Sequence, residues 1–318
     1  MLFRHDMTAP WYGRNEAQRM LVVLLATLVV AGTMVGALSL VLGRRVVSSR
    51  NGSCGPKVVQ PARSVTDAYD RRVLSFSPVL YLTLAHPFWR VEPDLSGHEQ
   101  NGEYLPKDES PGLARLPNGD AVAEFDGLGQ YVQVRSSSVL SVTRTGCLTV
   151  QAWFRPATLQ FPREEGSGYV YVLGKGASGR QEYALRMYSY SNKEHPPRPN
   201  RVSAYVFNLA GGEGSGSYFQ DDVHVGEWIM ATFVVEDRAT TSWPDGYIAI
   251  YEDGALRGMV SLEQFHVVPG ASSAPFRIAT RDLHSYFQGA IGKVAVYDEA
   301  LTGSDIRSTY LAMVAQHR

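Results

Sequence analysis

From Pro78 to the end of the chain, apolar side chains recur mostly at every second position. In the run 148–154, leucine, valine, alanine and phenylalanine alternate with threonine, glutamine and tryptophan. A period of two places one face of a strand on an apolar core and the other face outside it. The same pattern recurs at 131–134, 169–173, 183–188, 201–207, 228–235, 247–251 and 291–297. The sequence therefore predicts an all-β fold.

Asp-Gly pairs separate several of these runs, at 126–127, 245–246 and 253–254. Such pairs supply the positive φ angles of tight turns, and the pair at 253–254 lies between two apolar runs, as in a hairpin. Many strands joined by short polar turns are typical of an antiparallel β-sandwich or jelly roll. We therefore expect one large antiparallel sandwich domain after Pro78.

One helix is expected after the strands. Thr302 or Ser304 can cap its start. Apolar residues follow it on one side at helical spacing: Ile306, Tyr310, Leu311 and Val314. This pattern predicts a short C-terminal helix that packs on the sandwich.

Residues 20–42 form an apolar run of 23 residues without a charge. About 20 apolar residues cross a bilayer as a helix, whereas the apolar core of a signal peptide is around 7 to 15 residues. The run therefore predicts an uncleaved transmembrane helix in contact with the lipid bilayer. Arg and Lys residues flank both ends of it, and their tally leans slightly towards an exposed N-terminus, although large folded domains can translocate despite flanking charges.

Gly32 and Gly36 lie one helical turn apart within this run. That spacing lets two helix backbones approach closely and predicts a homodimer contact, although glycine is also frequent in membrane helices without this role. We divide the chain into an N-terminal tail (1–19), a transmembrane helix (20–42), a juxtamembrane linker (43–77) and a folded domain (78–318).

The composition excludes several kinds of site. The net charge is -1 and no basic stripe interleaves with aromatic residues, so we expect no nucleic-acid partner. Cys54 and Cys147 are the only cysteines and form no C-x-x-C motif, which argues against a structural zinc site or a redox motif. A disulfide between them and two free thiols both remain open.

The order of short motifs then suggests a family. The motifs are Asp94-Leu95-Ser96-Gly97, Phe125-Asp126-Gly127, Tyr131-Val132-Gln133-Val134, Thr149-Val150-Gln151-Ala152-Trp153, Gly226-Glu227-Trp228, Tyr251-Glu252-Asp253-Gly254 and the ending 287–297. In this order they resemble the laminin-G-like jelly rolls of the concanavalin A-like lectin and glucanase superfamily, over 78–313. The resemblance implies a fold that carries lectins, adhesion modules and glycoside hydrolases alike. Since the fold is commonest outside cells, we expect the C-terminal domain to be extracytoplasmic.

The resemblance also implies a calcium ion at the rim of the sandwich, held by carboxylates and carbonyl oxygens. Asp94 in the Asp-x-Ser-Gly turn is the best candidate ligand, and Asp126 is the second. At Gly292-Lys293, where many relatives carry Asp-Glu, the acidic groups are missing and a cation is present.

Glycan binding requires exposed aromatic rings beside amides or carboxylates. Trp243 lies at an expected hairpin tip, 241–246, where a tryptophan has no role in the core. Tyr188, Tyr190 and Asn192 precede a proline-rich loop and are expected on the same rim. Tyrosines at alternating strand positions also have an ordinary packing role, so that alternative stays open.

No catalytic motif accompanies the fold in the sequence. The chain has no Glu-x-Asp-x-Glu strand and no Gly-x-Ser-x-Gly elbow. We therefore expect a non-catalytic, membrane-anchored binding or adhesion module for a glycan or protein ligand. The alternatives are a structural accessory subunit of a membrane complex, and a glycoside hydrolase with an unrecognised carboxylate pair.

Overall fold

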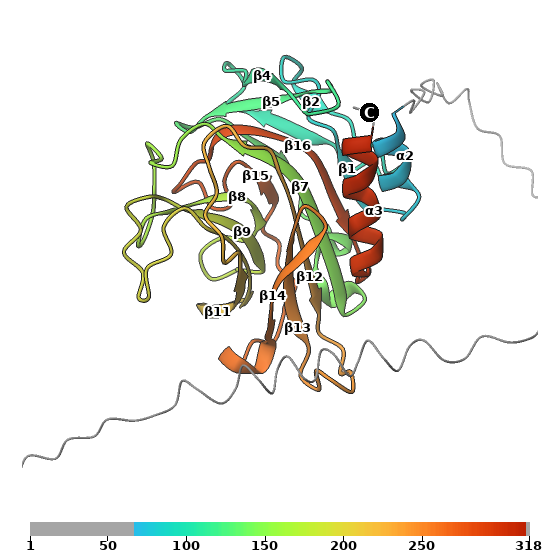
Figure 1. The fold of residues 1–318 in the computed structure, drawn as a ribbon, viewed down its shortest axis with the longest axis vertical. Coiled ribbons are helices and arrows are strands. Elements are labelled where there is room, and N and C mark those ends of the chain that lie inside the picture. The colour runs from blue at the N-terminus through green and yellow to red at the C-terminus, as the bar shows by residue number, and fades with distance from the viewer. Residues whose placement is uncertain (1–66, 316–318) are drawn as a thin grey trace, which may run out of the picture. The chain divides into compact units, whose positions relative to one another are not determined.

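The structure is a computed structural model that describes residues 67–315. Two eight-stranded sheets face each other, and two helices cover the outer side of one of them (Figure 1). Every strand pair in this part of the chain is antiparallel. The predicted all-β sandwich is confirmed.

We call the two sheets A and B. Sheet A contains, in spatial order, β14 (Ala255–Ser261), β13 (Tyr247–Glu252), β12 (Ile229–Glu236), β7 (Cys147–Pro156), β16 (Gln288–Tyr297), β5 (Ala121–Asp126) and β4 (Gly112–Arg115), with β1 (Leu80–Leu82) also paired to β16. Sheet B contains β11 (Gly211–Tyr218), β10 (Val202–Asn208), β9 (Tyr183–Tyr188), β8 (Tyr169–Lys175), β15 (Phe276–Ile278), β6 (Tyr131–Val134), β3 (Gly102–Leu105) and β2 (Val91–Glu92). Short 3-10 turns connect strands at η1 (Ser138–Leu140), η2 (Val142–Arg144) and η3 (Leu262–Phe265).

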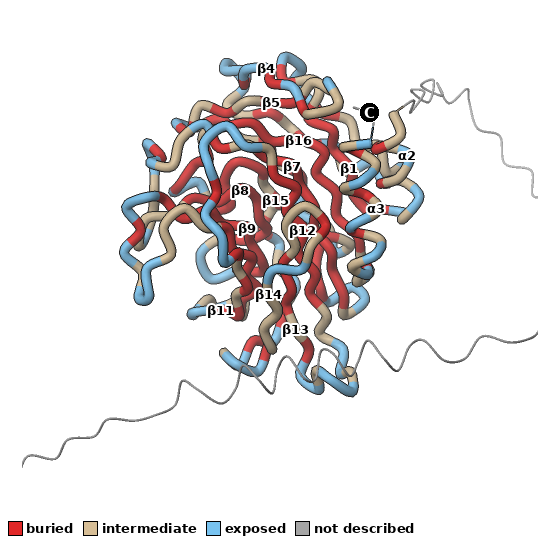
Figure 2. Tube along the Cα trace, viewed as in Figure 1, coloured by how far each residue is buried: buried red, intermediate tan, exposed pale blue. Residues whose placement is uncertain are grey.

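The central strand β7 is buried on both faces. Its alternating residues Val150 and Phe154 pack in the core between the sheets. Trp153, on the other face, packs beneath the helices. The polar residue Gln151 on that face donates from Nε2 to the Tyr69 hydroxyl at 2.7 Å, whereas its Oε1 has no hydrogen-bond partner among the described residues. Figure 2 shows this buried set concentrated along the strands, with the connecting loops exposed.

Helix α2 (Ala68–Leu74) lies inside the segment that the sequence analysis assigned to the linker. The side chain of Asp67 caps it, and Tyr69 and Val73 are fully buried against sheet A. The predicted domain boundary at Pro78 is therefore too late, because α2 precedes it and already packs on sheet A. A helix of seven residues with two buried side chains is too short for its apolar period to be recognised in the sequence.

Helix α3 (Gly303–Val314) confirms the expected C-terminal helix. Thr302 caps it, and Asp305 completes the capping box. Ile306 and Met313 are buried beneath it, whereas Leu311, expected on the same side, is 45% exposed. Helices α2 and α3 lie side by side on the outer face of sheet A (Figure 1).

The expected hairpin at Asp253-Gly254 joins β13 to β14, with φ angles of 51° and 81° at the two residues. The other predicted strands agree with observed ones to within a few residues.

Several predictions fall outside the described residues: the tail 1–19, the apolar run 20–42 with Gly32 and Gly36, and most of the linker. Within residues 67–315, no helix has both the length and the apolar character needed to cross a bilayer.

Candidate functional site

A groove of about 640 Å³ lies on the outer face of sheet B, where β2, β3 and β6 meet the loops beside them. It is lined by Val91, residues 99–103, Gln133 and residues 135–137, and we call it the polar groove. The strand period explains this lining, because Val132 and Val134 point into the core. Gln133 and Arg135, at the alternate positions, therefore face outward.

Two amide side chains of the polar groove, Asn101 and Gln133, are fixed through their oxygen atoms. Asn101 Oδ1 accepts a hydrogen bond from the backbone N of Asp94 at 2.8 Å, and Gln133 Oε1 accepts one from Arg277 Nε at 2.9 Å. Their NH₂ groups, and the exposed Arg135, have no partner among residues 67–315. The groove therefore offers hydrogen-bond donors in fixed positions.

Three apolar residues beside the groove are exposed to water. Phe88 is 68% exposed, Trp89 47% and Val91 45%. The Trp89 ring stacks on the His86 ring, with centroids 4.0 Å apart and an angle of 24° between the planes. Large apolar groups exposed together usually mark a binding surface.

The buried carboxylate of Glu92 fixes the loop that carries these residues. Its Oε1 accepts from Thr83 Oγ1 at 2.8 Å and from the backbone N of Ala85 at 3.2 Å. Its Oε2 accepts from the backbone N of His86 and from the Tyr104 hydroxyl, both at 3.1 Å. Burial and the charge of Glu92 raise the pKa of Tyr104 far above its usual value, so the phenol stays a donor. A buried charge with this many donors rigidifies its surroundings.

Asp94, the first predicted calcium ligand, organises a turn. Its two carboxylate oxygens accept four hydrogen bonds of 2.7–2.9 Å from the backbone N atoms of Tyr81, Ser96 and Gln100 and from Ser96 Oγ. The donors already occupy the lone pairs that a cation would need.

Asp126, the second predicted ligand, makes a local turn of its own. Its Oδ1 accepts from the backbone N of Leu128 at 2.8 Å. Within residues 67–315, neither Asp94 nor Asp126 belongs to a group of three metal-ligating side chains. The two carboxylates do not fit a shared calcium site, and calcium binding by this chain stays a prediction.

Trp243 lies, as predicted, in the turn between β12 and β13. It is half-buried, with its ring 5.9 Å from that of Tyr247. The turn lies beside the start of β7, because the backbone N of Asp237 donates to the carbonyl of Gly146 at 2.8 Å.

Tyr188, Tyr190 and Asn192 lie near the other end of β7, where the backbone N of Tyr190 donates to the carbonyl of Leu159. Tyr190 is 71% exposed, but Tyr188 is fully buried. Asn192 is also buried, and its Nδ2 donates to the carbonyls of residues 167 and 168. The expectation of one rim shared with Trp243 is therefore wrong: β7 is ten residues long and separates the two sets. The prediction failed because the sequence alone does not show at which end of the sandwich each loop lies.

Aromatic rings and an arginine fill the outer face of sheet B at β8–β10. The Arg186 guanidinium lies 4.3 Å from the Tyr169 ring centroid, 4.5 Å from that of Tyr205, 5.2 Å from Tyr171 and 5.3 Å from Phe207. Its Nη2 donates to the Tyr171 hydroxyl at 3.3 Å. We call these five residues the arginine–aromatic layer. Because its rings are largely buried, they serve packing and not ligand stacking.

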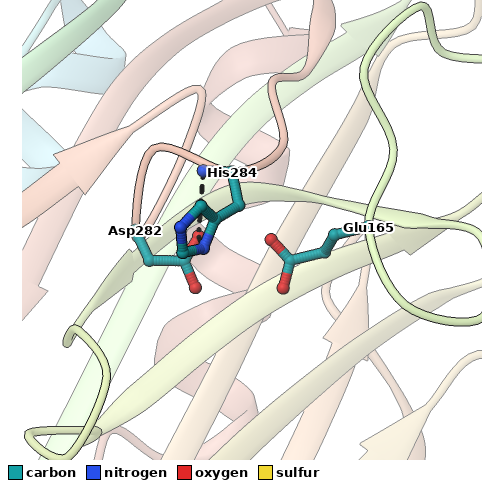
Figure 3. Close-up of side chains that lie close together, drawn as sticks. All are labelled: Glu165, Asp282 and His284. Atoms are coloured by element: carbon teal, nitrogen blue, oxygen red, sulfur yellow. Dashed lines mark hydrogen bonds and ion pairs between the residues drawn. The ribbon is translucent and has the colours of Figure 1, made fainter.

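Two carboxylates point toward each other at the edge of this layer (Figure 3). Ligand atoms of Glu165, Asp282 and His284 all lie within 4.8 Å of one another. Burial and the neighbouring Asp282 raise the pKa of Glu165. Burial alone would also raise the pKa of Asp282, but the Arg281 guanidinium at 2.7 Å holds it below its usual value. Neither carboxylate lines the polar groove.

Three carboxylates surround Lys293, the lysine that stands where many relatives carry an acidic residue. Its Nζ lies 2.6 Å from Asp70, 2.6 Å from Asp120 and 3.7 Å from Asp67. Burial alone would lower the pKa of Lys293, but the carboxylates of Asp70 and Asp120 raise it above its usual value. The ammonium group occupies the centre of the three carboxylates, where a metal ion would otherwise lie.

Comparison with known families agrees with the fold. A laminin-G-type family model, described as the concanavalin A-like lectin/glucanases superfamily, matches residues 126–307. The chain belongs to this superfamily. No curated protein matches the chain.

Several solved structures share the fold of this superfamily member at low sequence identity. Domain 4 of AbnA, a GH43 extracellular arabinanase from Geobacillus stearothermophilus, solved with arabinotriose, is 14% identical with a TM-score of 0.50, over 73% of this chain and 98% of that one. The botulinum neurotoxin serotype D ligand-binding domain, solved with N-acetylneuraminic acid, is 12% identical with a TM-score of 0.51, over 77% and 52%. The binding domain of Paraclostridial mosquitocidal protein 1 is 11% identical with a TM-score of 0.55, over 74% and 52%. The chain thus spans about half of each toxin domain, and at these identities the likeness shows the fold alone.

Sequence reasoning missed the polar groove and its aromatic loop. The segment His86-Pro87-Phe88-Trp89 carries two adjacent aromatic residues after a proline, outside any period-two run. This position could have indicated from the sequence that the two rings lie in an exposed loop. Glu165 and Asp282 are far apart in the chain, so no spacing in the sequence pointed to their proximity.

Proposed function

We propose that this domain is a non-catalytic glycan-binding module, which residues 20–42 hold at a membrane with the domain on the extracytoplasmic side. The observation that carries the proposal is the polar groove, where fixed amide donors, carboxylates and an arginine lie beside exposed aromatic residues. A sugar presents hydroxyl groups that both donate and accept, together with an apolar face of C–H groups. This arrangement complements both properties.

The charge of the groove favours a neutral sugar. Glu99 and Glu103 bring two carboxylates to the lining, against the one guanidinium of Arg135. Glu103 also pairs with Lys107 at 3.1 Å. An acidic sugar would have to approach the carboxylate of Glu99, which has no ion pair within residues 67–315, and this costs affinity. Solved structures of this fold hold both classes, arabinotriose in AbnA domain 4 and N-acetylneuraminic acid in the botulinum neurotoxin serotype D domain, so the proposed preference for a neutral sugar rests on the lining of the groove.

The test is a glycan array probed with the full-length chain in a detergent that has no sugar headgroup. We expect selective retention on neutral oligosaccharides, and loss of that retention when Gln133→Ala and Arg135→Ala are combined. Absence of any selective binding would contradict the proposal and favour a protein ligand or an accessory role in a membrane complex.

The Glu165–Asp282 pair favours a second candidate, a glycoside hydrolase. The pKa of Glu165 is raised and that of Asp282 is lowered. A glycoside hydrolase needs such a pair of close carboxyl groups, one to act as the acid and the other as the base or nucleophile. Release of reducing sugar that disappears in both Glu165→Gln and Asp282→Asn would establish it. We expect no such release, because neither carboxylate reaches the polar groove.

A further inference from the structure

We infer that Trp89 is the stacking residue of the polar groove and that the buried carboxylate of Glu92 positions it. This inference rests on the proposed function, since it assigns a residue to the sugar site proposed above.

The position of Trp89 follows from the covalent chain. It lies two residues before Val91, which lines the groove, and consecutive Cα atoms are 3.8 Å apart. The two Cα atoms are therefore within about 7 Å of each other, which places Trp89 at the margin of the groove. Phe88, at 68% exposure, extends the apolar surface beside it.

The orientation of the Trp89 ring is set from beneath. The ring stacks on His86, whose backbone N donates to Glu92 Oε2 at 3.1 Å. The His86 Nδ1 atom also lies 3.3 Å from both Glu92 oxygens. Glu92 is itself fully buried between its other donors. A ring held before the ligand arrives loses little conformational entropy on binding, so its contact contributes more fully to affinity.

The occupant is a sugar and not an apolar peptide, because only one side of the groove is apolar. The rest of the lining consists of amide, carboxylate, hydroxyl and guanidinium groups. An apolar side chain placed there would leave these groups without partners, which costs affinity. A sugar ring covers the aromatic residue with its C–H face and meets the polar lining with its hydroxyl groups.

The test measures binding of neutral trisaccharides of arabinose, glucose and galactose to the full-length chain by isothermal titration calorimetry. Trp89→Ala should weaken binding at least about tenfold, the effect expected of a central aromatic contact, and Trp89→Phe should retain part of it. Trp243→Ala is the matched control, since that tryptophan lies in the turn between β12 and β13 and does not line the groove. Thermal melting of each variant confirms that it folds.

A double-mutant cycle tests the role of Glu92. If Glu92 acts through Trp89, Glu92→Gln weakens binding in the wild-type background and has no further effect in Trp89→Ala. A purely structural role would weaken both backgrounds equally, and that result would overturn the positioning role.

The outcomes separate the two claims. If the wild-type chain binds none of the trisaccharides, both the proposed function and this inference fail. If it binds them and Trp89→Ala binds as tightly, or if Trp243→Ala abolishes binding instead, the inference alone is overturned.

Discussion

The two halves of the outer face of sheet B use the same kinds of residue in opposite ways. At β8–β10, tyrosine and phenylalanine rings surround Arg186 and are largely buried. At β2, β3 and β6, Arg135 follows the end of β6 and is exposed, with no ion pair within the described part of the chain, and the exposed Trp89 precedes β2. The first half stabilises the sheet and the second half offers a surface. Aromatic content alone therefore does not identify a sugar site, whereas exposed rings beside unpaired donors do.

The largest effect that tests this contrast is expected in the arginine–aromatic layer. Arg186→Met removes a buried guanidinium from four aromatic rings and leaves the Tyr171 hydroxyl without its donor. We expect the free energy of unfolding to fall by about 3 kcal/mol, with no change in sugar affinity. Chemical denaturation with a parallel binding titration measures both.

Arg155→Met is the matched control for that variant. The Arg155 guanidinium lies 5.3 Å from the Trp228 ring centroid, but its side chain is more exposed and pairs with Glu124, so its loss should lower the free energy of unfolding less. An equal loss of unfolding free energy in the two variants would show that the arginine–aromatic layer does not stabilise sheet B more than an ordinary surface contact does.

The polar groove should give the reverse pattern. Arg135→Ala removes an exposed side chain, so the free energy of unfolding should change by less than about 0.5 kcal/mol. Affinity for a neutral trisaccharide should fall about five- to tenfold, because a charge-assisted hydrogen bond is lost. Arg144→Ala, at an exposed position on η2, should change neither quantity. A large stability loss in Arg135→Ala would contradict the contrast between the two halves.

The carboxylate pair at the edge of the arginine–aromatic layer predicts a smaller, pH-dependent effect. Because the pKa of Glu165 is raised in the folded state, its contribution to stability is fully present below its ordinary pKa near 4.5 and is lost as pH rises through the raised value. Glu165→Gln should therefore leave stability nearly unchanged at pH 4 and increase it at pH 7. Thermal melting across this range measures the difference, and a variant that is less stable at pH 7 would refute this account.

Calcium should have the smallest effect. The four hydrogen bonds to Asp94 leave no free carboxylate oxygen for a cation there. We expect the thermal midpoint to differ by less than about 1 °C between excess calcium and chelator, since an ion that does not bind the folded state cannot stabilise it. A clear upward shift with calcium would show a site elsewhere in the chain.

The fold followed from sequence because period-two runs and Asp-Gly turns act locally. β9 (Tyr183–Tyr188) and β6 (Tyr131–Val134) have the predicted bounds for this reason. The helix α2 was missed because its stability comes from Tyr69 packing on sheet A and not from its own period.

The site was less accessible to sequence reasoning because it depends on exposure and on strand direction. Trp243 and Tyr190 each lie in a loop as expected, but at opposite ends of β7. Asp94 has the residue type of a calcium ligand, yet the number of its hydrogen-bond donors appears only in three dimensions. Trp89 differs from the buried Trp153 only in what surrounds it.

The ion pairs of Lys293 have a mechanical consequence. Asp67 and Asp70, at the start of the described chain, contact a lysine on β16, which pairs with β7 near the middle of sheet A. A pull applied at Asp67 would therefore load these ion pairs and the packed Tyr69 before it reached the outer strands of either sheet. Force applied on the N-terminal side would therefore act on the middle of sheet A. A central strand has neighbours on both sides, so it is harder to separate than a strand at the edge of the sheet.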